Sequence, residues 1–222
     1  MEDLGQTQQI LGMRIMHDKR NNQLWLSKEK YIKKVLDKFN MKDANLVVTP
    51  LVAHFKLSTK LCPRGDKEEE EMRKIPYSTA IGSLMYAMVC TRPNIAYSVG
   101  VVSKFLANPG KQHWQVVKWI LRYLKGTSHY CLCFDHNETV LEGFTNAYMA
   151  GDMDTKKSTT GYFYTFAGAT VSWVLRLQRI VALSTTKEEY IAATEDHKYI
   201  WIHRFIGEIG IKQDMYVLYS DS

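Results

Sequence analysis

Three side chains in the second half of the chain have the types and places of a metal-dependent site. The stretch GFTNAYMAGDMDTKKSTTGYFY, residues 143–164, predicts a strand, a polar loop and a second strand, with Asn146 where the first strand ends. Glu189 stands early in a predicted helix, and Asp221 ends a final predicted strand. If the first strand is central in its sheet, these three points converge. Carboxylates there would bind two Mg²⁺ ions, which polarise a phosphodiester and activate a water for in-line attack.

Each of these residues also has an ordinary structural interpretation. Asn146 could be a strand-end residue whose amide bonds a neighbouring backbone group. Glu189 follows Thr186 by three residues and Glu188 follows Thr185 by three, so either pair could form a helix-capping box. Asp221 could simply be solvated. The residues alone leave these alternatives open.

The elements that would position this site follow one another after residue 128. Short runs rich in β-branched and aromatic residues predict successive strands, and one long helix is predicted from about Thr186 to Gly207 before the last strand. The strand runs are HYCLCFD, VLEGFTNA, GYFYTFAG, TVSWVL, IVALST and, after the helix, MYVLYSDS.

The first half is mainly helical. Residues 9–27 predict a hairpin, and Ser27 is the expected N-cap of a helix in SKEKYIKKVLDKFNM. An irregular connection over 41–64 and a solvated charge run, DKEEEEMRK, precede three more helices. In the last of these, Lys118, Arg122 and Lys125 could form a basic strip for phosphates or could be solvated. We expect a boundary between a helical and a strand-rich half near residues 127–138.

Composition gives weaker constraints. The 222 residues carry a formal net charge of +6, which favours anionic partners, nucleic acid among them. No apolar run reaches the roughly 20 residues needed to cross a bilayer, and the N-terminus lacks the features of a signal peptide. We therefore expect an intracellular protein, in the cytoplasm or nucleus, without a membrane partner. The sequence leaves the oligomeric state open.

Long collinear motifs resemble the C-terminal part of the Pol polyprotein of plant Ty1/copia-type retrotransposons. ILGMRI, LSKEKYIKKVLDKFNM, IPYSTAIGSLMYAMVCTRPNIAYSVGVVSKFLANPGKQHW and ILRYLKGT resemble the segment that joins reverse transcriptase to ribonuclease H. GFTNAYMAGDMDTKKSTTGYFYTFAGATVSW, ALSTTKEEYIAATE and LYSDS resemble the ribonuclease H domain itself. The resemblance covers essentially the whole chain.

This resemblance implies an α/β fold in which an α+β N-terminal segment precedes a truncated ribonuclease H-like mixed sheet with flanking helices. It divides the chain into a reverse transcriptase C-terminal or connection segment, 1–127, and a C-terminally truncated ribonuclease H-like domain, 128–222. The family's Mg²⁺ ligands fall on Glu189, on Asp221 and, for the first acidic ligand, on Asn146. The implied partner is an RNA–DNA hybrid or another nucleic acid, contacted by Lys118, Arg122, Lys125, Lys156 and Lys157.

The chain also departs from the family's pattern. The family motif TDADWAG is TNAYMAG here, differing at Asn146, Tyr148 and Met149, and SWKSKKQ is SWVLRLQ. With only Glu189 and Asp221 as acidic ligands, we expect Mg²⁺ to bind weakly or not at all. The expected function is a Pol remnant with a degenerate ribonuclease H-like domain, unable to cleave RNA in hybrids but retaining some nucleic-acid binding. The alternatives are an active Mg²⁺-dependent hybrid ribonuclease and a host-retained protein-interaction module.

Overall fold

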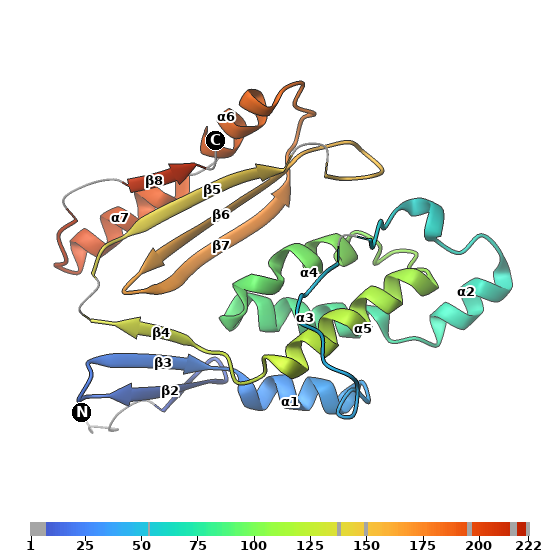
Figure 1. The fold of residues 1–222 in the computed structure, drawn as a ribbon, viewed down its shortest axis with the longest axis horizontal. Helices are drawn as coiled ribbons and strands as arrows, with labels where there is room; N and C mark the ends of the chain where they lie inside the picture. The colour runs from blue at the N-terminus through green and yellow to red at the C-terminus, as the bar shows by residue number, and fades with distance from the viewer. Residues whose placement is uncertain are drawn as a thin grey trace. The chain divides into compact units, whose positions relative to one another are not determined.

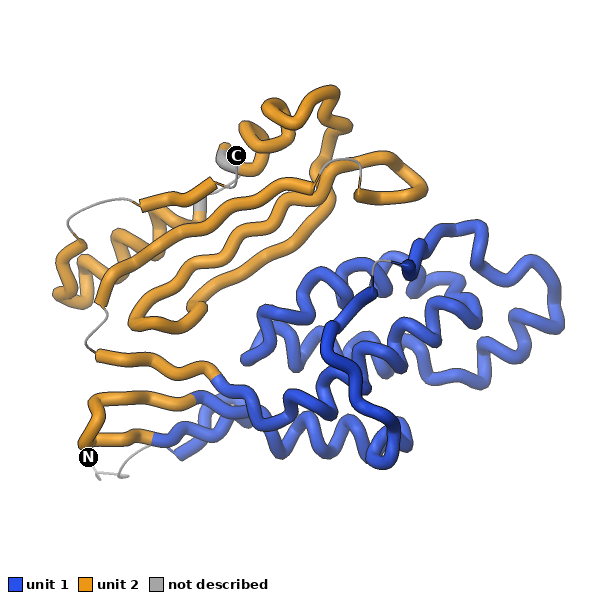
Figure 2. The backbone as a smooth tube through the Cα atoms, in the orientation of Figure 1, with its two compact units in different colours: residues 1–16, 26–131 blue, residues 17–25, 132–222 orange. Residues whose placement is uncertain are grey.

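The computed structural model describes residues 8–52, 54–136, 139–148, 151–194, 197–213 and 217–220. The chain separates into two compact units (Figure 2). Unit 1 comprises residues 1–16 and 26–131, and unit 2 comprises residues 17–25 and 132–222. The tip of the N-terminal hairpin therefore groups with unit 2, whereas the expected division placed all of residues 1–127 in one segment.

The elements alternate between strands and helices in a way that makes the protein α/β (Figure 1). The first half begins with strands and continues with helices. Its elements are β1 Gln9–Ile10, β2 Met13–Asp18, β3 Gln23–Ser27, α1 Glu29–Lys38, η1 Thr59–Leu61, α2 Asp66–Arg73, α3 Tyr77–Thr91, η2 Pro93–Ile95, α4 Ala96–Ser103 and α5 Lys111–Gly126. The second half contains β4 Leu132–Asp135, β5 Glu142–Tyr148, β6 Thr159–Phe166, β7 Ala169–Leu177, α6 Thr185–Thr194, α7 His197–Glu208 and β8 Val217–Ser220.

The core of unit 1 lies between α1, α3, α4 and α5. Apolar residues recur on each helix at three- and four-residue spacing, so each helix presents one apolar stripe to its neighbours. The fully buried members of this core include Ile32, Ile81, Leu84, Val99, Val117, Ile120 and Leu121. Residues 66–73 of the charge run form α2, which keeps its acidic side chains largely outward and buries Met72.

Lys28 ties the first hairpin to the helices of unit 1. The chain turns at Gly12 with φ +67°, and the neighbouring Leu11 carbonyl accepts a hydrogen bond from the Lys28 ammonium at 2.7 Å. The ammonium also donates to the Tyr86 hydroxyl at 2.9 Å and lies 4.1 Å from that ring's centroid. A buried lysine is tolerated here because a carbonyl, a hydroxyl and an aromatic face replace its water.

Unit 2 is built on a four-stranded sheet in the order β7-β6-β5-β8. β5 runs antiparallel to β6 and parallel to β8, so it lies inside the sheet, which is the condition on which the predicted convergence depended. β6 and β7 are antiparallel, with an irregularity at Tyr164/Thr165. The other sheet has the order β1-β2-β3-β4.

Helices α6 and α7 cover one face of the β7-β6-β5-β8 sheet. Tyr199 of α7 contacts Tyr164 of β6, with ring centroids 5.4 Å apart, and its hydroxyl bonds the Leu141 carbonyl. A Cβ on Gly143 of β5 would come within about 3 Å of the same Tyr199 ring. Because β side chains alternate, the opposite face carries Phe144, which stacks on Phe163 and Tyr219.

Several predicted elements are confirmed and two details are corrected. The hairpin over 9–27, the helices α3, α4 and α5 and the final strand are present. The run IVALST, residues 180–185, is wrong as a strand: β7 ends at Leu177, and Ile180, Val181 and Leu183 are exposed. The chain leaves the sheet there because Gln178 turns inward and is held by three hydrogen bonds, which are described below.

The N-cap of α1 is the second correction. It is Lys28 rather than Ser27. The Ser27 hydroxyl still accepts a hydrogen bond from the Glu29 N–H, at 3.3 Å. None of the helices in the described residues is long and apolar enough to cross a membrane.

Candidate functional site

Asn146 occupies the C-terminal part of the central strand β5. It pairs with Gly161 of β6 and is exposed, whereas the preceding Thr145 is buried. By strand alternation Asn146 shares the face of Phe144, and Thr145 shares the face covered by α6 and α7. The strand thus presents an uncharged amide at the position where the family resemblance predicts the first acidic metal ligand.

The strand β8, which precedes the third predicted ligand in the sequence, lies beside β5. Thr145 pairs with Ser220 in a parallel register, so the two strands run side by side in the same direction toward Asn146. Asp221 itself lies outside the described residues. The topology therefore meets the requirement that the first and last strands of the sheet be neighbours.

Helix α6 carries Glu188 in its first turn and Glu189 directly after it, and the two lie in different environments. Glu188 is buried, at 3 % exposure, and its Oε2 has no hydrogen-bond partner among the described residues. Glu189, the predicted metal ligand, is half-buried. The side chain of Glu188, rather than that of the predicted ligand Glu189, is therefore the one buried in the protein interior.

Neither capping box proposed for this helix is the cap that forms. The Ser184 hydroxyl accepts a hydrogen bond from the Lys187 N–H at 3.2 Å, and the Ser184 carbonyl accepts the first helical bond, from the Glu188 N–H. Ser184 is therefore the residue that caps α6, one position before Thr185. Glu188 and Glu189 are thereby released from the capping role.

Gln178 fixes α6 against the sheet, and sequence reasoning missed it. Its side-chain amide donates to the Thr160 hydroxyl at 3.0 Å and to the Glu188 carbonyl at 2.9 Å. Its own N–H donates to the Ser158 carbonyl at 2.9 Å. Gln178 is 1 % exposed, so these bonds form away from water and are costly to lose. The only sequence signal was a lone glutamine directly after a strand, which is too common to single out.

The loop between β5 and β6 has a defined structure in residues 151–158. Asp152 is buried and accepts hydrogen bonds from the backbone and the hydroxyl of Thr155. Lys156 follows with φ +58° and is exposed. Lys157 donates its ammonium to the Arg179 carbonyl at 2.9 Å, so this predicted phosphate contact is also a structural tie to the end of β7.

The predicted basic strip on α5 is half-buried rather than fully available. Lys125 donates to the Ala44 carbonyl at 2.8 Å and so holds the chain just after α1 against α5. The Arg122 guanidinium lies 5.4 Å from the Trp119 ring centroid. Lys118 is half-buried. At least two of the three side chains thus have structural contacts of their own.

The donor set described at this site does not fit a two-metal centre. Two hard cations need several carboxylate oxygens, and Asn146 supplies only a neutral amide oxygen. Within the part of the chain that the structure describes, no group of three or more histidine, cysteine, aspartate or glutamate side chains could hold a metal ion.

Comparison with known proteins gives matches along the full chain. It is 59% identical over 223 residues to the "Retrovirus-related Pol polyprotein from transposon TNT 1-94" of Nicotiana tabacum, covering 100% of this chain and 17% of that protein. It is 35% identical over 195 residues to the "Retrovirus-related Pol polyprotein from transposon RE1" of Arabidopsis thaliana, covering 85% and 13%. The chain therefore spans less than a fifth of either polyprotein.

A third relative is nearly as short as the matched segment itself. The "Secreted RxLR effector protein 161" of Plasmopara viticola is 44% identical over 133 residues, which are 59% of this chain and 94% of that protein. No protein-family profile and no solved structure matches the chain. The identity to transposon polyproteins, over 100% and 85% of this chain, shows that the chain belongs to the copia-type retrotransposon Pol polyprotein family.

Proposed function

We propose that this chain is a Pol segment with a degenerate ribonuclease H-like domain, which does not cleave RNA in RNA–DNA hybrids but still binds nucleic acid. The observation that supports it most is the sheet of unit 2. Its central strand β5 carries Asn146 in its C-terminal part and lies parallel to β8, which precedes Asp221. The arrangement suits the family's metal site, but its first position holds an amide.

The expected loss of activity follows from charge. With Glu189 and Asp221 as the remaining acids, about −2 of formal charge would have to hold two divalent cations, so at least one Mg²⁺ binds weakly or not at all. If that removes about 4 kcal/mol of transition-state stabilisation, the rate falls on the order of a thousandfold.

A cleavage assay on an RNA–DNA hybrid with Mg²⁺ tests this proposal. The unmodified chain should cleave at background rate, and Asn146→Asp should raise any rate that Glu189 and Asp221 still support. The exposed Glu208, on α7, provides a matched control as Glu208→Ala. Robust cleavage by the unmodified chain that is lost in Glu189→Ala and kept in Glu208→Ala would reject the proposal in favour of an active ribonuclease.

A second candidate function is a protein-interaction module. The observation that favours it is the 44% identity to a protein named as an effector, 94% of whose length lies in the match. That relative shows the matched segment existing without most of a Pol polyprotein. Absence of hybrid binding at low salt, where phosphate-driven binding is strongest, would favour this candidate over the first.

A further inference from the structure

The positive charge of the chain is not shared between its two units. Unit 1 contains 19 lysine and arginine residues against 10 aspartate and glutamate residues, a formal charge of +9. Unit 2 contains 10 against 13, a formal charge of −3. Together these give the +6 of the whole chain. An electrostatic attraction to polyanions therefore belongs to the helical unit, not to the unit that carries the ribonuclease H-like site.

Helix α1 of unit 1 carries a row of three lysines, which we call the α1 lysine row: Lys30, Lys34 and Lys38. All three are exposed. They stand four residues apart, so they lie on one side of the helix with about 6 Å of rise between neighbours. Residues on the opposite side, Ile32, Val35 and Leu36, are buried in the core of unit 1 and fix the orientation of the row.

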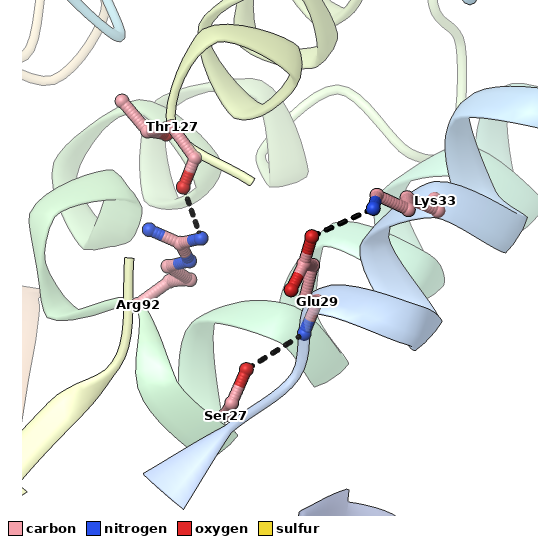
Figure 3. Close-up of polar contacts among 5 residues, drawn as sticks. All are labelled: Ser27, Glu29, Lys33, Arg92 and Thr127. Atoms are coloured by element: carbon pink, nitrogen blue, oxygen red, sulfur yellow. Dashed lines mark hydrogen bonds and ion pairs between the residues drawn. The ribbon is translucent and has the colours of Figure 1, made fainter. Parts of the chain in front are cut away.

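The acidic side chains of α1 do not neutralise this row, because each is paired with another lysine. The Glu29 carboxylate forms an ion pair with the Lys33 ammonium at 2.6 Å, and the Glu29 N–H donates a hydrogen bond to the Ser27 hydroxyl (Figure 3). The hydrogen bond from Lys33, together with its charge, lowers the pKa of Glu29. Asp37 pairs with Lys42 at 3.0 Å. Within the described residues, the α1 lysine row has no ion pair.

We propose that the α1 lysine row binds alternate phosphates along a nucleic-acid backbone, without reading base sequence. Phosphates of one strand are spaced by about 3.4 Å along a duplex axis, so the roughly 6 Å step of the row suits every second phosphate. Lysine ammonium groups act as point charges toward phosphate and do not select a base. That the ligand is a nucleic acid rests on the proposed function. The new content is that unit 1 binds it, through the α1 lysine row.

The test compares two triple variants of the full chain that change the net charge equally. One is Lys30→Gln/Lys34→Gln/Lys38→Gln. The matched control is Lys33→Gln/Lys42→Gln/Lys111→Gln, which removes three lysines of unit 1 that are also exposed but are ion-paired, Lys111 with Glu71 at 2.7 Å. Binding of a labelled RNA–DNA hybrid of about 20 base pairs is measured by anisotropy over a series of salt concentrations, and circular dichroism confirms that each variant is folded.

The α1 lysine row variant should bind the hybrid at least about tenfold more weakly at low salt. Its plot of log K against log salt should lose about 2 to 3 units of slope, since each phosphate contact contributes about 0.9. The control should lose far less on both measures. Equal losses in the two variants would overturn the proposal, because binding would then depend on net charge alone.

Three further outcomes would also overturn it. The first is an unmodified chain that binds no hybrid, which would refute the proposed nucleic-acid binding as well. The second is hybrid binding that survives in the row variant but is lost in Lys156→Gln/Lys157→Gln, which leaves the proposed function standing and removes only this surface. The third is binding of the unmodified chain to phosphatidylserine vesicles in preference to the hybrid, which would assign the row to a lipid surface.

Discussion

Tyr77 shows what one buried polar group contributes to unit 1. It is 3 % exposed, and its hydroxyl donates a hydrogen bond to the Val102 carbonyl at 2.8 Å, joining the start of α3 to the end of α4. Burial raises the pKa of this phenol above its ordinary value of 10.0, because the phenolate would be stranded in apolar surroundings. The folded site therefore favours the protonated phenol.

The sign of the resulting pH dependence follows from linkage. A group whose pKa is raised in the folded state contributes stability that is present below the unfolded pKa and is lost as the pH rises above it. The unmodified chain should thus lose stability in unit 1 above about pH 10. Tyr77→Phe should cost about 1 kcal/mol at neutral pH, for the lost hydrogen bond, and should lose less stability between about pH 10 and 11.

Denaturant unfolding, monitored through amide exchange in α3, measures the difference in stability between the unmodified chain and Tyr77→Phe. The difference in free energy of unfolding between the unmodified chain and Tyr77→Phe should narrow by up to about 1.4 kcal/mol per pH unit between about pH 10 and 11. Tyr190→Phe, at an exposed tyrosine of α6, controls for removing a phenol elsewhere. A constant gap from neutral pH to pH 11 would show that the Tyr77 phenol is not the titrating group.

At the scale of elements, two glycines of unit 1 are expected to respond in opposite directions to the same substitution. Gly110 precedes α5, and a Cβ there would lie 1.9 Å from the Leu61 carbonyl oxygen of η1. Its N–H donates to His113 Nδ1 at 2.8 Å, which fixes the start of α5. Gly82 lies in the exposed side of α3, with nothing within 4 Å of a Cβ.

We expect Gly110→Ala to destabilise unit 1 by at least about 2 kcal/mol, because the backbone of η1 must move. Gly82→Ala should stabilise it by about 0.5–1 kcal/mol, since alanine is the better helix former at an open position. Thermal unfolding of the two variants beside the parent chain provides the measurement. If Gly110→Ala were neutral, the close approach of η1 to the start of α5 would be refuted.

At the scale of the whole molecule, each unit has a hydrophobic core of its own. The larger cluster gathers the helices of unit 1. The smaller one, in unit 2, comprises Leu141, Tyr162, Tyr164, Tyr199 and Ile206. Units with separate cores can open separately, so a destabilised unit 2 need not lower the protection of unit 1.

Gln178→Ala tests this separation. The loss of its two buried side-chain hydrogen bonds should cost about 1–3 kcal/mol and release the first turn of α6. Hydrogen exchange should quicken in β6, β7 and α6 and stay unchanged in α3 and α5. Arg179→Ala, the exposed neighbour, should change neither set. Equal loss of protection in α3 and α5 would mean that the chain unfolds as one cooperative body.

Much of the fold could be predicted from the chain alone because the signals are local. Periodic apolar residues and helix-breaking Pro109-Gly110 mark α3 and α5, and alternating aromatic runs mark β5, β6 and β7. The run IVALST misled because β-branched residues predict a strand only if a partner strand is available, and the inward turn at Gln178 removes it. The α1 lysine row could have been found from its four-residue spacing.

The sequence by itself determined the family, the α/β class and the identity of the amide at Asn146, because these depend on residue types and on their order along the chain. Only the tertiary structure decided that Glu188 rather than Glu189 is buried, that Ser184 caps α6, and that Lys125 and Lys157 hold backbone carbonyls. These outcomes depend on which groups meet across distances of many residues. Such long-range contacts are set by the packing of whole helices and strands, and a local sequence pattern does not predict them.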